Sequence, residues 1–224
     1  MIAFATATPW SGVPSLLLPA LGQTAAMVGI VMSIVIALGL PLGLLIFNTS
    51  PRGLAPHQSL HASVSWIANL GRSLPFLVLM ATVIPFTQLV VGTTIGIKAA
   101  IIPMSLAGIP FFARLVENAI REIPRARLDV GIASGASRLQ VIRTIQLVEA
   151  LPGIVAGLAL NIVAMIEYSA IAGAIGAGGL GYLAVNYGYE QFDGHIMISC
   201  IVVLVLIVQF VQFSGDRIVR SLIH

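Results

Sequence analysis

The sequence predicts an all-α, polytopic membrane protein with five transmembrane helices and a helix–glycine–helix segment on the cytoplasmic side. Of its 224 residues, 58% are hydrophobic and only 8% are charged, and the mean hydropathy is +1.03. A soluble domain carries about 25% charged residues. A chain with so little polar surface must present much of its exterior to lipid. This excludes a soluble enzyme, a nucleic-acid-binding protein and a disordered chain.

Five stretches meet the requirement of about 20 mostly apolar residues for a membrane crossing. The predicted spans are residues 22–47, 63–86, 93–115, 150–172 and 194–213, within one transmembrane domain of residues 1–224. PFTQ at 85–88 and GTTIG at 92–96 predict a turn between the second and third spans. The apolar pieces before Gln23 contain Pro14 and Pro19, which favours an interfacial lead-in over a sixth span.

The arginines predict the orientation, because cytoplasmic loops carry an excess of basic residues. Nine arginines fall on one side of the predicted spans: Arg52, Arg114, Arg121, Arg125, Arg127, Arg138, Arg143, Arg217 and Arg220. The opposite loops, 87–92 and 173–193, contain no Lys or Arg, and neither does the stretch before the first span. The N-terminus is therefore expected outside and the C-terminus in the cytoplasm.

The long connection between the third and fourth spans has a readable local structure. Pro124 suits the start of a helix, Gly135 interrupts it, and Ser137 with Gln140 fits a capping box. Leu139, Ile142 and Ile145 then recur at helical spacing. Two interpretations stay open from these residues: a solvated loop that only enforces topology, or an apolar ridge that docks into a groove on a partner protein.

Within this connection, the sequence resembles a known family. Permeases of bacterial ABC importers carry the motif E-A-A, three residues, G, nine residues, I-x-L-P. Asp129-Val130-Gly131 stands in place of E-A-A, Gly135 has the expected spacing, and Ile145-Gln146-Leu147-Val148 follows. Six further segments are similar to methionine-uptake permeases: PFTQLVVGTTIGIKAAIIP (85–103), PFFARLVENAIREIP (110–124), VEALPG (148–153), EYSAIAGAIGAGGLG (167–181), NYGY (186–189) and QFSGDRIVR (212–220).

The resemblance implies a homodimer of five-helix subunits, two cytoplasmic ATPases and an extracytoplasmic methionine-binding lipoprotein. It also implies that residues 124–150, hereafter the coupling segment, dock on the ATPase. ATP and Mg would bind to that partner, with no cofactor or metal in this chain. The expected coupling residues are Asp129, Gly135, Ser137, Leu139, Ile142, Ile145 and Leu147. Another small amino acid or a related metabolite stays open as the cargo.

Five residues of the fourth span are candidates for lining the translocation path: Asn161, Glu167, Tyr168, Ser169 and Ile171. An ionisable residue inside a span is costly unless it faces protein or a water-filled cavity. Glu167 could instead reach the outer interface or pair with Lys98. Asn161 is most simply an interhelical hydrogen-bonding residue.

Other function classes find little support in the sequence. Gly176 to Gly181 match G-x-G-x-x-G, but no strand precedes them, so a flexible outer end of the fourth span is expected rather than a dinucleotide site. The sequence contains no G-x-x-x-x-G-K-[ST], so ATP must bind to another subunit, and no H-E-x-x-H. An intramembrane enzyme is therefore disfavoured and no catalytic residue is predicted, while a passive channel is an alternative that ATPase-dependent uptake would separate from an importer.

Overall fold

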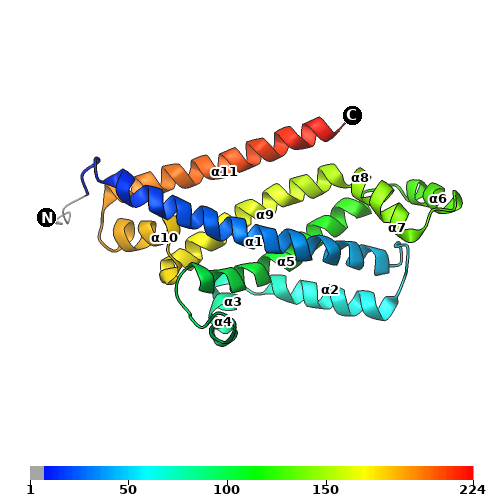
Figure 1. Cartoon of the computed structure of the whole chain (residues 1–224), viewed down its shortest axis with the longest axis horizontal. Coiled ribbons are helices and arrows are strands. Elements are labelled where there is room, and N and C mark those ends of the chain that lie inside the picture. The colour runs from blue at the N-terminus through cyan, green and yellow to red at the C-terminus, as the bar shows by residue number, and fades with distance from the viewer. Residues whose placement is uncertain (1–7, 224) are drawn as a thin grey trace. The chain divides into compact units, whose positions relative to one another are not determined.

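The computed structural model describes residues 8–223. Over these residues the chain forms helices and turns and no strand, as Figure 1 shows with α1 in blue and α11 in orange to red. In chain order the elements are α1 (Val13–Thr49), α2 (Gln58–Ser73), α3 (Phe76–Thr82), α4 (Ile84–Val91), α5 (Ile97–Arg121), α6 (Arg125–Ala133), α7 (Arg138–Val141), the π-helical turn η1 (Ile142–Gln146), α8 (Leu147–Glu149), α9 (Leu151–Ala172), the π-helical turn η2 (Gly173–Ala177), α10 (Gly179–Tyr182), the π-helical turn η3 (Leu183–Tyr189) and α11 (Gly194–Leu222).

Within residues 8–223, four helical stretches are long and apolar enough to cross a membrane: α1, α5, α9 with η2, and α11. The predicted all-helical membrane fold is confirmed. The predicted lead-in before Gln23 is wrong, because α1 begins at Val13 and runs for 37 residues, about 55 Å at 1.5 Å per residue. Pro14 lies in the first turn, where its missing N–H costs nothing, and membrane helices also tolerate an internal proline such as Pro19.

The second predicted span is not one straight helix. The chain breaks at Leu74 and Pro75 between α2 and α3, and the two form a bent pair that counts as a fifth crossing only if they are taken together. Proline lacks the N–H that a continuing helix needs and disfavours helical backbone in the residue before it. The predicted turn is also shorter than expected, because PFTQ belongs to α4 and the turn starts at Gly92.

The contacts divide the described chain into two units. Unit 1 comprises residues 8–33, 74–107 and 162–211, and unit 2 comprises residues 34–73, 108–161 and 212–223. Each unit is described by itself below. The single domain of residues 1–224 stays a prediction.

The core of unit 1 joins the start of α1 to the glycine-rich region after α9. Ala20, Leu180, Leu183, Ile196 and Cys200 form a buried cluster. Next to it, two α1 side chains bind the start of α10. The Gln23 side-chain oxygen accepts a hydrogen bond from the Gly179 N–H at 2.7 Å, and Thr24 Oγ accepts one from Leu180 at 2.9 Å. These bonds satisfy N–H groups that a helix start leaves without intrahelical partners.

Asp193 caps α11 and holds the chain at Thr8. Its carboxylate accepts hydrogen bonds from the N–H groups of Thr8 at 2.8 Å, His195 at 3.1 Å and Ile196 at 3.2 Å. The His195 ring packs on Trp10 with 4.2 Å between centroids. Burial raises the pKa of the Asp193 carboxyl, but the hydrogen bonds that it accepts outweigh burial and hold the pKa below its ordinary 3.8. The attachment is therefore complete above pH 3.8 and is lost as the pH falls through the lower folded pKa.

Unit 2 is held by close approach of helices at small residues. Ile46, Ala68 and Ala113 form its buried cluster, with one residue each from α1, α2 and α5. A Cβ added at Gly43 would lie 2.7 Å from the Cβ of Val116, so α1 and α5 could not pack as they do with a larger residue there. Small residues at such crossings are typical of helix packing in membranes.

Candidate functional site

The coupling segment is built from two short helices joined at Gly135. Backbone hydrogen bonds from Gly135 to the Ile132 carbonyl at 3.0 Å and from Ala136 to the Gly131 carbonyl at 3.2 Å close α6. Gly135 has φ of +82°, a left-handed conformation that residues with a Cβ adopt at a cost. The predicted interruption at Gly135 is confirmed.

The predicted capping box starts the second helix. The Ser137 N–H donates to Gln140 Oε1 at 2.7 Å, and the Gln140 N–H donates to Ser137 Oγ at 3.4 Å. The two residues thus satisfy one another's free N–H groups. The box fixes where α7 begins after the turn at Gly135.

The predicted ridge of Leu139, Ile142 and Ile145 does not form one exposed face. Leu139 is 55% exposed, whereas Ile142 and Ile145 are half-buried. The reason is η1, whose i→i+5 hydrogen bonding replaces the 3.6-residue repeat that the prediction assumed. Ile145 packs on α6, where a Cβ added at Gly131 would lie 2.5 Å from its Cδ1. The exposed large apolar residues of the coupling segment are Val130, Ile132, Leu139 and Val148.

The other side of the coupling segment is anchored to the end of α1. Gln146 is fully buried and forms a reciprocal amide pair with Asn48, in which each side chain donates to the other's oxygen at 2.9 Å. Leu128 and Val141 of the coupling segment are also buried in unit 2. A buried polar pair is stable when both members are satisfied. The pair therefore fixes the end of η1 to α1.

Two ion pairs complete the anchoring. Arg125 Nε lies 3.0 Å from Asp129 Oδ1, and Arg127 pairs with Glu149. Arg125 also donates to the carbonyl oxygen of Arg52, in the turn after α1. Asp129, a predicted coupling residue, is exposed, and its carboxylate is already paired within α6. Leu147, another predicted coupling residue, is half-buried in α8.

A buried charged cluster at the end of α5 was not predicted. Glu117 is 1% exposed and pairs with Arg114 at 2.6 Å and with Arg121. Arg114 also donates to the Ser65 carbonyl of α2 at 2.8 Å. The signal was present in the sequence, because a carboxylate with arginines at i−3 and i+4 lies on one helix face. We interpreted these arginines only as determinants of topology.

The candidate residues of α9 differ in what they contact. Asn161 is buried and donates to the Gly108 carbonyl of α5 at 3.2 Å, as the interhelical alternative predicted. Ser169 is buried and donates to the carbonyl of Ile166 in its own helix at 2.7 Å. Tyr168 stacks on Phe76 with 4.3 Å between ring centroids. The contacts of Asn161 and Tyr168 therefore join α9 to other helices, whereas the Ser169 bond stays within α9.

Glu167 is the exposed member of this group, and Ile171 is half-buried. Within residues 8–223, the ion pairs do not include one between Glu167 and Lys98, so the alternative of a pair between them is not realised. Consecutive residues of a helix lie about 100° apart around its axis. Residues 167–169 therefore cannot all line one path.

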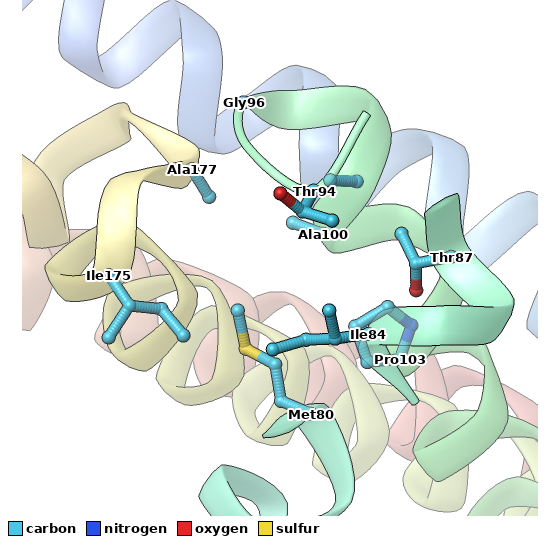
Figure 2. Close-up of a pocket in the computed structure, with 10 residues that line it drawn as sticks. Met80, Ile84, Thr87, Thr94, Gly96, Ala100, Pro103, Ile175 and Ala177 are labelled. Carbon is cyan, nitrogen blue, oxygen red and sulfur yellow. The ribbon is translucent and has the colours of Figure 1, made fainter. Parts of the chain in front are cut away.

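A small pocket lies where the glycine-rich turn after α9 meets α3, α4 and the start of α5. Figure 2 shows Ile175 and Ala177 on one side of it and Thr87 on the other, with Met80, Ile84 and Pro103 between them. The Gly96 N–H donates to the Gly176 carbonyl at 3.1 Å and closes this region. The cavity volume of about 20 Å³ holds no more than a water molecule. This pocket is therefore too small for a small-molecule ligand in the described state.

The glycine-rich turn itself is kinked rather than part of a nucleotide fold. Ile175 and Gly176 have non-helical backbone angles inside η2, and Gly176 has φ of +102°. No strand precedes this turn among the described residues. Across residues 8–223, no three His, Cys, Asp or Glu side chains are placed to hold a metal ion.

Residues 39–224 match the family described as binding-protein-dependent transport system inner membrane component. The probable D-methionine transport system permease protein MetI of Vibrio cholerae serotype O1 is 42% identical over 224 residues, 100% of both chains. The D-methionine transport system permease protein MetI of Escherichia coli K12 is 41% identical over 184 residues, covering 82% of this chain and 85% of the relative.

Solved structures agree. A chain of the MetNI methionine ABC transporter, in inward facing conformations and the CY5 native crystal form, matches with a TM-score of 0.91 and 41% identity, covering 93% of this chain and 97% of that one. A chain of an amino acid ABC transporter with histidines shares the fold, with a TM-score of 0.76 and 16% identity over 93% of this chain and 94% of that one. The family match and the full-length identity together place this chain in the family of binding-protein-dependent transport system inner membrane components.

Proposed function

We propose that this chain is the permease subunit of an ATP-driven importer and carries methionine across the bacterial cytoplasmic membrane by alternating access. The observation that carries the proposal is 42% identity over the full length of a relative described as a probable D-methionine permease. The similarity to a chain of the MetNI methionine ABC transporter supports the same class of transporter. The cargo is assigned through these relatives and not through a binding residue.

The proposed assembly contains two copies of this chain, two cytoplasmic ATPases and an extracytoplasmic substrate-binding lipoprotein. The sequence has no G-x-x-x-x-G-K-[ST] motif, so ATP and Mg bind to the ATPase and this chain supplies no catalytic residue or cofactor. The N-terminus lies outside and the C-terminus lies in the cytoplasm. The nine arginines on one side of the spans support this orientation.

The coupling segment transmits ATPase movement to the permease in this proposal. The exposed side chains of Val130 and Leu139 contact the ATPase groove, as apolar residues of a short helix do in a partner's groove. On the opposite side, the Asn48–Gln146 pair passes a rigid-body displacement to α1. Gly135 and the capping box at Ser137 set the angle between the two short helices. Glu167, exposed on α9, is the residue that we propose to face the translocation path.

The test is uptake by the permease reconstituted in vesicles with its ATPase and binding protein. We expect labelled methionine to accumulate with ATP and not with a non-hydrolysable analogue. Leu139→Asp should abolish both ATPase co-purification and uptake, because a charge without a partner would be buried at the contact. Ile223→Asp, the same change at an exposed residue at the C-terminal end, is the control and should retain both.

Two results would contradict the proposal. Uptake of methionine without the ATPase would indicate a passive channel. Accumulation of a different small amino acid, with methionine neither transported nor competing, would keep the transporter class and replace the cargo.

A further inference from the structure

A basic cleft opens in unit 2 between the turn after α1 and the chain that follows α5. Its cavity volume is about 490 Å³, and Arg52, Arg121 and Arg125 line it together with Phe47 and Leu128. An adjoining hollow of about 250 Å³ shares Phe47, Arg52 and Arg121. Volumes of about 300–1,000 Å³ are typical of small-molecule sites. No Asp or Glu belongs to either lining set.

The three arginines retain positive charge for a ligand. Arg121 pairs with Glu117, and Arg125 pairs with Asp129, but their side chains are still 52% and 49% exposed. Arg52 is exposed and forms no ion pair within the described part of the chain. The lining therefore carries positive charge without a carboxylate, and such a lining attracts a phosphate. Arginine binds phosphate with paired N–H donors.

The wall that carries Arg52 is held in place before any ligand arrives. After α1 the backbone turns through hydrogen bonds from Ser50 to the Phe47 carbonyl at 3.0 Å and from Gly53 to the Ser50 carbonyl at 2.9 Å. Arg125 donates to the Arg52 carbonyl from across the cleft. A preformed site loses little conformational freedom on binding.

The position of the cleft indicates the source of the phosphate. It lies at the ends of α1 and α5, two helices able to cross a membrane, and Phe47 and Leu128 give it an apolar wall. Basic pockets at the cytoplasmic ends of membrane helices bind anionic lipid headgroups. We propose that this cleft binds the phosphate headgroup of an anionic phospholipid of the cytoplasmic leaflet. The choice of leaflet rests on the orientation given under the proposed function.

Native mass spectrometry of the delipidated transporter complex in detergent tests this site. Phosphatidylglycerol should bind with a stoichiometry of one per permease chain, and phosphatidylcholine should bind at least several-fold more weakly. Arg52→Gln should weaken phosphatidylglycerol binding about five-fold, as expected for one basic residue at a charged surface. Arg52→Lys should restore most of the affinity. Arg220→Gln removes a basic residue that does not line the cleft and should leave the affinity unchanged.

Three outcomes would overturn the inference. Equal binding of phosphatidylcholine would show that charge does not select the ligand. Displacement by equimolar inorganic phosphate would identify a free anion as the ligand. Loss of ATPase co-purification in Arg52→Gln with unchanged lipid binding would make the cleft a protein contact.

Uptake of methionine is measured on the same preparations. Its failure with lipid binding intact would contradict the proposed function alone, whereas intact uptake without lipid binding would contradict this inference alone.

Discussion

At the residue scale, the charges at the end of α5 show how a membrane protein stabilises a buried carboxylate. Glu117 is 1% exposed and has Arg114 and Arg121 as partners on the same helix. Taking a charge out of water is costly, and opposite charges with good hydrogen-bonding geometry offset that cost. Because Arg114 also bonds to the Ser65 carbonyl, the cluster ties α5 to α2.

Glu117→Gln should destabilise the protein strongly, because it leaves two arginines beside a buried neutral group. Removing one partner of a buried pair costs about 3–5 kcal/mol, and the partial exposure of Arg121 favours the lower end. Thermal unfolding in detergent measures the effect. Glu122→Gln, at an exposed position directly after α5, is the control and should change the unfolding temperature little. Equal stability of both variants would contradict a structural role for the cluster.

At the element scale, the coupling segment departs from a regular helix in two places. Gly135 turns the chain with φ of +82°, and η1 widens the helix over Ile142–Gln146. The turn was predictable from glycine itself. The π-helical turn was not, because no local sequence pattern marks it; it accompanies the packing of Ile145 against Gly131 and the pairing of Gln146 with Asn48. Both contacts join residues distant in the sequence.

Gly135→Val should misalign α6 and α7 without unfolding the spans. A Cβ at Gly135 meets no atom within 4 Å, so the cost is backbone strain of about 1–2 kcal/mol. We expect reduced ATPase co-purification and uptake, with the mass of the permease dimer unchanged in detergent. Gly135→Asn is the matched control, because asparagine tolerates the left-handed region, and it should remain close to wild type. If Gly135→Val binds the ATPase and transports normally, the backbone angle at this turn does not matter for coupling.

At the scale of the whole molecule, the order of crossings and the arginine distribution lead to one orientation. Four helical stretches and one bent pair among the described residues can cross the membrane. The arginines of the coupling segment and of α11 then share a side. If α2 and α3 together make a fifth crossing, the two ends of the chain are expected on opposite sides of the membrane.

Cysteine labelling in intact cells tests this orientation. Val130 and Tyr189 are 68% and 69% exposed, so a cysteine at either position should be reachable in the folded protein. In cells that express the permease without its ATPase, which would otherwise cover Val130, an impermeant maleimide should label Tyr189→Cys from outside and should label Val130→Cys only after the cells are opened. The native Cys200 is buried and should stay unlabelled, which provides the background control. Labelling of Val130→Cys in closed cells would overturn the five-crossing orientation.

The sequence by itself determined the class of this protein. Long uncharged stretches in a chain with so few charges are stable in lipid, so the membrane class and the approximate place of four crossings followed from composition. Gly135 and the Ser137–Gln140 box were also predictable, because turn and cap chemistry acts over a few neighbouring residues. The motif and its flanking segments carried the family. Local patterns of this kind do not depend on the rest of the fold.

Only the tertiary structure decided which of these residues are exposed and what they contact. It separated Leu139 from Ile142 and Ile145, paired Asn48 with Gln146 and gave Asn161 a packing role. It also brought Arg52, Arg121 and Arg125 around one cleft. Residues far apart in the sequence meet only when helices pack, and helical periodicity gives no information on which partner a side chain meets. The break at Pro75 shows the same limit, since an apolar stretch is long enough to cross whether or not it runs straight.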